Sequence, residues 1–158
     1  MKHIAALILC ISAVSCGISA QAQERTGYIA PKLSHAGYGE LNIVVPVTSA
    51  EPAVWQQKLG NISNALNAAN TFGGQLQIKV VSYHAGIDLL KQKDNNIAKA
   101  IQELRAKGVQ FLACNQTLKR MDIDYRTLNG VAESDIVPAG FLEVAWLQSQ
   151  NYKVDPMN

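Results

Sequence analysis

The sequence predicts an α/β domain in which helices cover both faces of a mostly parallel sheet of five strands. Short apolar runs bounded by turn residues alternate along the chain with segments of helical periodicity. The helical segments span roughly 10 to 17 residues, which is long enough to carry the chain back along a sheet. Such strand–helix–strand units give parallel strands with right-handed crossovers.

The first strand–helix–strand unit is predicted over residues 41–81. Residues 41–47 form a compact apolar run and are interpreted as a buried strand. The helix after it has a single apolar stripe, formed by Trp55, Leu59, Ile62, Leu66 and Ala69. It ends at Gly73-Gly74, and residues 76–81 form the second strand. Polar residues alternate with apolar ones in that strand, which predicts a position nearer an edge of the sheet.

The third strand, residues 109–113, leads directly into Cys114. The helix before it has an apolar stripe of Ile97, Ile101 and Leu104. Asn95 or Asn96 is expected to cap the start of that helix, and Gly108 its end. The final helix is predicted to pack through Phe141, Val144, Ala145 and Leu147. Shorter predicted elements are helical turns at 87–90, 117–121 and 124–128 and strands at 134–137 and 152–154.

The N-terminus has the pattern of an export signal. Lys2 precedes an apolar stretch over residues 4–14 that is too short to span a bilayer. Cleavage is expected after Ala22, which would make the protein periplasmic, with an extended arm over residues 23–40. Alternatively, Cys16 ends a sequence that resembles a lipoprotein box, and lipidation there would tether the chain to a membrane.

Composition excludes several classes of function. The chain has 158 residues, enough for one ordinary domain, and a formal net charge of +2, so no strong field points to nucleic acid or to an anionic membrane. No phosphate loop is present, because Gly37-Tyr38-Gly39 precedes the first strand instead of linking a strand to a helix. His35 and the other scattered histidines and cysteines have no metal-ligand spacing. No cofactor and no metal are therefore expected.

Cys114 is the candidate nucleophile. After export it would be the only thiol left, because Cys16 would be either removed or acylated. It is therefore buried filler, an intermolecular link or a reactive group. It stands where an apolar strand gives way to polar residues. Asn115, Gln116 and Thr117 could begin a helix there and aim N–H donors at a thiolate, which would lower its pKa.

Two further residues are predicted at the same rim of the sheet. His84 follows the second strand and could stabilise a thiolate or move its proton, or it is a loop residue that bonds its own backbone. Ser49 follows the first strand and either lines the crevice or helps to cap the next helix. In a flavodoxin-like strand order, the reversal that forms ligand sites lies between strands one and three, beside Cys114.

Three segments together resemble the DsrE/DsrF-like family, in particular an exported and poorly characterised branch of it. They are residues 81–90 with their histidine–glycine element, residues 104–117 ending in C-N-Q-T, and residues 137–152 beginning with V-P-A-G. The resemblance covers roughly residues 38–156, and the domain is expected over residues 41–156. It implies a flavodoxin-like three-layer α/β/α fold, assembly as a homo-oligomer such as a trimer or hexamer, and a cysteine that accepts and passes on persulfide sulfur.

The resemblance assigns that sulfur-carrying role to Cys114. It assigns a role to His84 more weakly, because the family's histidine-glycine-proline-glycine stretch is shortened here to His84-Ala85-Gly86. The predicted function is a periplasmic sulfur carrier or transferase that acts without a cofactor and exchanges sulfur with donor and acceptor proteins. The alternative is a non-catalytic oligomeric module of the same fold that binds a small ligand. A thiol-dependent enzyme is a third possibility.

Overall fold

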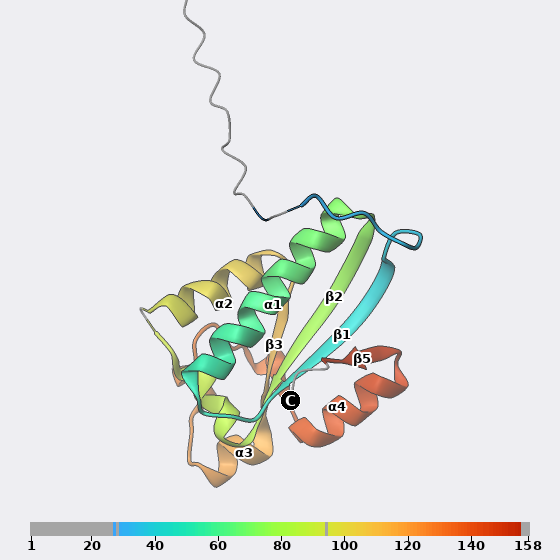
Figure 1. Cartoon of the computed structure of the whole chain (residues 1–158). Coiled ribbons are helices and arrows are strands. Elements are labelled where there is room, and N and C mark those ends of the chain that lie inside the picture. Colours follow the sequence, from blue (N-terminus) through green and yellow to red (C-terminus); the bar gives the residue numbers. More distant parts are fainter. Residues whose placement is uncertain (1–26, 28, 94, 156–158) are drawn as a thin grey trace, which may run out of the picture. The chain divides into compact units, whose positions relative to one another are not determined.

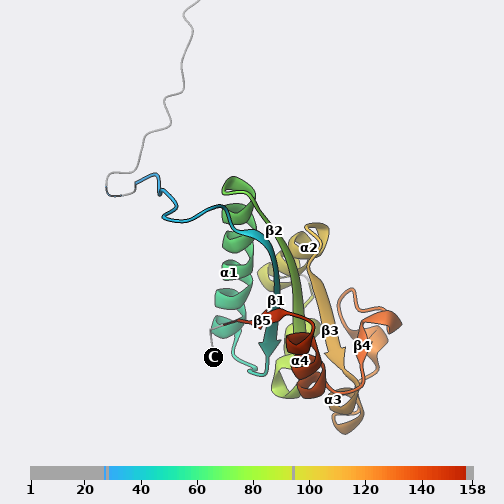
Figure 2. The same cartoon turned by 90° about the vertical axis from the view of Figure 1, so that its right-hand side faces the viewer.

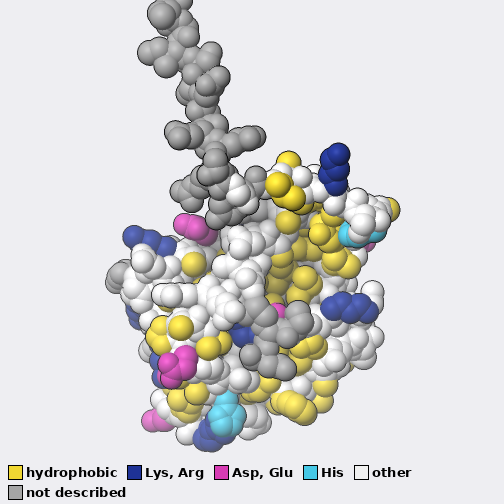
Figure 3. Space-filling view, in the orientation of Figure 1, with side chains coloured by type: hydrophobic (Ala, Val, Ile, Leu, Met, Phe, Trp, Pro, Cys, Tyr) yellow, Lys and Arg dark blue, Asp and Glu magenta, His cyan; other side chains and the backbone are white. Residues whose placement is uncertain are grey.

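The computed structural model describes residues 27, 29–93 and 95–155. The predicted export signal, with Cys16 and the cleavage position after Ala22, lies outside these residues. Leu33–Asn158 group as one compact unit, and the fold below is that of this unit (Figure 1). None of its described helices is long and apolar enough to cross a membrane. On the face drawn in Figure 3, charged side chains are scattered and form no single patch.

Five parallel strands form one sheet, in the order β4-β3-β2-β1-β5 (Figures 1 and 2). The longest pairing joins β1 and β2, from Gly39 opposite Gly74 to Val47 opposite Ser82. The strands are β1 (Gly39–Val47), β2 (Gly74–Ser82), β3 (Gln110–Cys114), β4 (Ile136–Val137) and β5 (Tyr152–Val154).

Helices lie on both faces of this sheet, which confirms the predicted three-layer α/β/α architecture (Figure 2). The α-helices are α1 (Pro52–Thr71), α2 (Asn96–Ala106), α3 (Asn115–Arg120) and α4 (Gly140–Ser149). The 3-10 segments are η1 (His84–Lys91), η2 (Tyr125–Thr127) and η3 (Glu133–Asp135). α1, η1, α2 and α3 cover the first face, and α4 covers part of the second.

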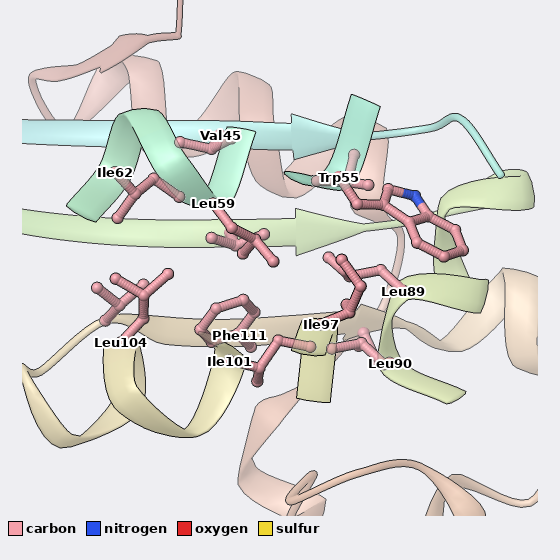
Figure 4. Close-up of a cluster of buried hydrophobic side chains, with 14 of the residues drawn as sticks. Val45, Trp55, Leu59, Ile62, Leu89, Leu90, Ile97, Ile101, Leu104 and Phe111 are labelled. Carbon is pink, nitrogen blue, oxygen red and sulfur yellow. The ribbon is translucent and has the colours of Figure 1, made fainter. Parts of the chain in front are cut away.

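The main core lies between the first face of the sheet and the helices α1 and α2 (Figure 4). The predicted α1 stripe provides Trp55, Leu59 and Ile62, which meet Val45 of β1 and Phe111 of β3. Burying each such side chain stabilises the fold by about 1.5–3 kcal/mol. The α2 stripe completes this core as predicted, and the Asn95 side chain caps α2 by accepting a hydrogen bond from Ala98 N–H at 2.9 Å.

The second face has a smaller core under α4. Val144 and Leu147 of α4 pack on one valine or leucine from each of four strands. These strand residues are Val44, Val81, Leu112 and Val137. The predicted apolar stripe of this helix is wrong at Phe141 and Ala145, which are exposed, because a single helix over one face buries only its sheet-facing side.

The second strand does not lie near an edge, as its alternating polar residues predicted. β2 is the middle strand of the five. Its polar residues Gln77 and Lys79 lie on the second face, toward the amino ends of the strands, in a stretch that α4 does not cover. They line a groove of about 300 Å³ there, together with Gln110 and Tyr152. The alternation of polar and apolar residues in β2 therefore results from an uncovered sheet face and not from a position at the sheet edge.

The strand order also moves the predicted crevice. β2 lies between β1 and β3, so the expected site between strands one and three does not exist. The connections that leave β1, β2 and β3 stay on the first face, whereas α4 leaves β4 on the second face. Neighbouring connections therefore diverge between β3 and β4, and this is the switch point at which parallel α/β sheets form ligand sites.

Candidate functional site around Cys114

Cys114 lies at this switch point. It is the last residue of β3 and also the N-cap residue of α3. Cys114 is only 4% exposed, and its thiol forms no disulfide. The predicted position at the end of the third strand is therefore confirmed, and the strand beside it is β4, which pairs Val137 with Cys114.

Four donors surround the sulfur of Cys114. They are the backbone N–H groups of Gln116, Thr117 and Gly140 and the hydroxyl of Thr117. Gln116 and Thr117 are in the first turn of α3, while Gly140 is the first residue of α4, so two helix N-termini converge on one thiol. The α3 contacts do not meet the geometry of a regular N-cap hydrogen bond, and we treat them as dipoles aimed at the sulfur.

These donors favour the thiolate over the neutral thiol. Burial removes water from Cys114 and by itself raises the pKa of the thiol. The Thr117 hydroxyl and the three backbone N–H groups outweigh burial, and the net pKa of Cys114 is lowered. Because the thiolate is the nucleophilic form of cysteine, we expect Cys114 to react faster near neutral pH than an ordinary buried thiol.

Thr117 is fixed by a second hydrogen bond. Its Oγ1 accepts from the backbone N–H of His84 at 2.9 Å, and the residue is 4% exposed. One lone pair of Thr117 Oγ1 therefore accepts from His84, and the O–H proton of Thr117 is left to point at the Cys114 sulfur. Thr117 thus joins the segment after β2 to the thiol after β3.

His84 reaches the site through its backbone. It begins η1 with a φ of +56°, a left-handed conformation that is uncommon for a residue with a Cβ. Gly86 holds the same turn against β1, because a Cβ at Gly86 would lie 2.0 Å from the carbonyl oxygen of Val47. The His84 side chain is exposed. The predicted assistance by its imidazole stays a prediction.

Sequence reasoning missed two residues of the site, Gly140 and Tyr83. A Cβ at Gly140 would lie 2.7 Å from the Cβ of Tyr83, so only glycine lets α4 begin this close to β2 and the thiol. Burial, and then the negative charge at Cys114, raise the pKa of Tyr83. The V-P-A-G segment could have pointed to Gly140 if the β3/β4 switch had been known.

The remaining predicted residues, Ser49 and Asn115, are not among the donors around the Cys114 sulfur. Ser49 forms a local turn into α1, in which its Oγ accepts from Glu51 N–H at 3.1 Å; it follows β1, which β2 separates from β3. The N-cap residue of α1 is Glu51 and no side chain caps this helix, so Ser49 supports the turn before α1 and does not cap it. Asn115 is half-buried and lines a separate hollow beside Lys119. Over the described residues, no group of three His, Cys, Asp or Glu side chains could hold a metal ion.

Fold and site together define a class: small parallel α/β proteins with a buried free cysteine at the switch point of the sheet. The chain belongs to the DsrE/DsrF-like family, whose sequence profile matches residues 47–154. The match runs from the end of β1 to the end of β5 and includes Cys114. The resemblance seen in the sequence is thereby confirmed.

A solved structure shows the same fold. It is the protein of unknown function MTH1491 from Methanobacterium thermoautotrophicum, which superimposes with a TM-score of 0.54 at 24% sequence identity. The alignment covers 74% of this chain and 97% of that protein. At this identity the similarity concerns the fold alone. None of the curated proteins compared with this chain matches it.

Proposed function

We propose that this protein is a sulfur carrier in which Cys114 cycles between a thiol and a persulfide. Membership of the DsrE/DsrF-like family connects the fold with sulfur transfer. The observation that carries the proposal is the set of four donors on the Cys114 sulfur, which lowers its pKa despite its burial. A packing cysteine needs no such donors, because an uncharged thiol is a weak acceptor.

The proposed cycle needs no external oxidant or reductant. In the first step the Cys114 thiolate attacks the terminal sulfur of a donor persulfide; a new S–S bond forms, and the donor leaves as its thiolate. In the second step an acceptor thiolate attacks the terminal sulfur held on Cys114, and Cys114 leaves as a thiolate. A lowered pKa assists the second step, because a thiol of lower pKa is the better leaving group.

The donors around Cys114 suit both states of the cycle. A persulfide is an anion that extends one sulfur atom beyond the Cys114 Sγ. Its inner sulfur would keep the Thr117 hydroxyl and the Gly140 N–H as neighbours, while its outer sulfur would be presented to a partner. Tyr83 borders the same space, and its phenol is held protonated because its pKa is raised.

Export is part of the proposal, and its support is the sequence of residues 1–22. The donor and acceptor would then be periplasmic proteins or small persulfides. Mass analysis of the mature chain distinguishes cleavage after Ala22 from lipidation of Cys16, and an unprocessed N-terminus would contradict export.

Loading with sulfur tests the proposal. The mature protein is incubated with a small-molecule persulfide, and its intact mass is measured after removal of the donor. We expect an added mass of about 32 Da, one sulfur atom, in the wild type and none in Cys114→Ser. Absence of the adduct from the wild type would refute the carrier role.

One observation favours the alternative of a non-catalytic module, namely the 4% exposure of Cys114. A thiol this buried reacts slowly unless the surrounding segments move. Alkylation of Cys114 distinguishes the two functions. A rate at neutral pH that exceeds that of a small free thiol supports the carrier, and a rate far below it at every pH supports the module.

A further inference from the structure

The first residues of β2 have a strand partner on one side only. β1 pairs with β2 from Gly74 onward, whereas β3 pairs with it only from Lys79 onward. β2 therefore extends beyond the amino end of β3 (Figure 1). Within the part of the chain that the structure describes, no strand pairs with residues 74–78 on the β3 side, and we call this stretch the β2 edge.

The groove of about 300 Å³ on the second face reaches the β2 edge. Leu76 and Ile78 line the groove, although their side chains pack in the main core on the other face. These two residues therefore border the groove with their backbone. Lys107 and Gly108, which lead from α2 into β3, close the groove at the end where β3 begins.

The pairing of β2 shows which backbone groups face the groove. The N–H of Tyr83, directly after β2, donates to the C=O of Val47 in β1 at 3.1 Å. Successive residues of a strand direct their N–H and C=O groups to opposite sides, so the odd-numbered residues of β2 face β1. Leu76 and Ile78 consequently direct theirs away from β1, toward the groove. An unpaired strand edge of this kind can pair with an extended peptide.

We propose that the β2 edge binds the C-terminal end of another protein, which adds to the sheet as a short parallel strand. The last residue of this peptide would lie opposite Gln77. Its N–H would donate to the C=O of Leu76, and its terminal carboxylate would accept from the N–H of Ile78. The inference goes beyond the proposed function, because the groove lies at the amino end of β3 and Cys114 at its carboxyl end.

The shape of the groove requires a chain end. A strand added beside residues 74–77 would run in line with β3, and the start of β3 at Gln110 blocks its path. The peptide must therefore terminate there. If it is parallel to β2, like every other strand of the sheet, the end that meets Gln110 is its C-terminus.

The charge of the groove favours a carboxylate over an amino terminus. Lys79 is half-buried in the groove, follows Ile78 directly, and has its Nζ 5.5 Å from the centre of the Tyr152 ring. None of the described residues that line the groove is acidic. Lys107 adds a second positive charge at the closed end, although its Nζ lies 3.5 Å from Asn67 of α1. A terminal carboxylate would be stabilised by Lys79, whereas a terminal ammonium would be repelled.

Fluorescence anisotropy of a labelled peptide tests the proposal. The probe is a peptide of alternating valine and threonine, which favours an extended strand; it ends in threonine and has fluorescein at its N-terminus. We expect saturable binding to the mature chain when the C-terminus is a free carboxylate, and binding weaker by about ten-fold or more when it is an amide. No binding of the free acid up to about 1 mM protein, or equal binding of acid and amide, would overturn the proposal.

Substitution of Lys79 tests the charge. Lys79→Gln should weaken binding of the free acid by about ten-fold and leave binding of the amide unchanged, whereas Lys79→Arg should retain most of the affinity. The matched control is Lys99→Gln, which removes the same charge from an exposed position of α2 and should bind as the wild type does. Equal binding by Lys79→Gln and the wild type, or an equal loss in Lys99→Gln, would contradict a carboxylate held by Lys79.

The position of the peptide is tested by two-dimensional NMR of the mature chain. The amide signal of Ile78 should shift in parallel with binding, and the signals of Thr117 and Gly140, beside the thiol, should stay in place. Methylation of the last peptide nitrogen removes the donor to Leu76 and should abolish binding. Shifts confined to Thr117 and Gly140, or unchanged binding of the methylated peptide, would overturn pairing with the β2 edge. A failure of sulfur loading while the peptide still binds would refute the carrier role alone.

Discussion

At the scale of single residues, the Thr117 hydroxyl links two segments that are 33 positions apart in the chain. It accepts from the His84 backbone N–H and donates to the Cys114 sulfur. The strained φ of His84 sets the direction of its N–H group. The hydrogen bond from this N–H orients the Thr117 hydroxyl, so that the hydroxyl proton points at the Cys114 sulfur. We therefore expect the reactivity of Cys114 to depend on this hydroxyl group and on the backbone conformation of His84.

Thr117→Val should slow alkylation of Cys114 at neutral pH. A hydrogen bond to a charged group contributes about 1.5–3 kcal/mol, so losing this one lowers the thiolate fraction on the order of ten-fold or more. Thr117→Ser keeps the hydroxyl and should retain most of the rate. The measurement is the pH dependence of the alkylation rate, whose midpoint should move to higher pH in Thr117→Val alone. Equal midpoints in all three proteins would show that the Thr117 hydroxyl does not lower the pKa of Cys114.

Sequence reasoning identified Cys114, Gln116 and Thr117 because they follow one another at a strand end. It could not identify the donor from Gly140 or the contact with Tyr83, because both depend on which strands are neighbours. The backbone role of His84 was equally hidden, since a histidine in a loop gives no sign of a positive φ. Local sequence therefore predicted the half of the site that comes from one segment.

At the scale of elements, the site depends on how closely the N-terminus of α4 approaches β2. Gly140 allows this approach because it has no Cβ to meet Tyr83. The same contact directs the Gly140 N–H at Cys114 and starts the helix that covers the second face of the sheet.

Gly140→Ala should destabilise the protein and raise the pKa of Cys114. The added methyl group would overlap Tyr83, and such overpacking costs about 1–3 kcal/mol. Gly60→Ala is the matched control, because Gly60 lies inside α1 with open space around its Cβ position, and alanine there should stabilise the helix by up to about 1 kcal/mol. Urea unfolding curves of both variants provide the measurement. A stable Gly140→Ala protein with unchanged Cys114 reactivity would contradict this view of α4.

Element types and most boundaries were predictable because they follow local patterns. The α1 stripe, the Asn95 cap and the fifth strand are where the sequence placed them. β4 is shorter than predicted, because η3 takes up its first residues. The strand order was not predictable, since the alternation in β2 has the same appearance at a sheet edge and on an open face.

At the scale of the whole molecule, the thiolate at Cys114 contributes to folding in a pH-dependent way. Its pKa is lowered in the folded state relative to the unfolded chain, where a cysteine has a pKa of about 8.5. The stabilising contribution is therefore fully present above about pH 8.5 and is lost as the pH falls through the lowered folded pKa.

The free energy of unfolding of the wild type minus that of Cys114→Ala should accordingly grow as the pH rises. The growth should end near pH 8.5, which is about the pKa of a cysteine in an unfolded chain. Denaturant unfolding over a pH series measures it. Cys114→Ala is an adequate reference up to about pH 8.5, because Tyr83, whose pKa is raised by burial and by the Cys114 charge, stays protonated in that range. A difference that shrinks with rising pH would mean that the folded protein holds Cys114 as a neutral thiol.

A complete sulfur cycle on one protein sample is the sharpest test of Cys114 as a sulfur carrier. The mature chain is loaded by a persulfide donor, separated from it, and then mixed with a small acceptor thiol while its intact mass is followed. We expect that one sulfur atom is gained, that it is lost to the acceptor, that the chain can be loaded again, and that Cys114→Ser shows none of these steps. A wild type that never gains the sulfur, or an adduct that persists in Cys114→Ser, would contradict this role.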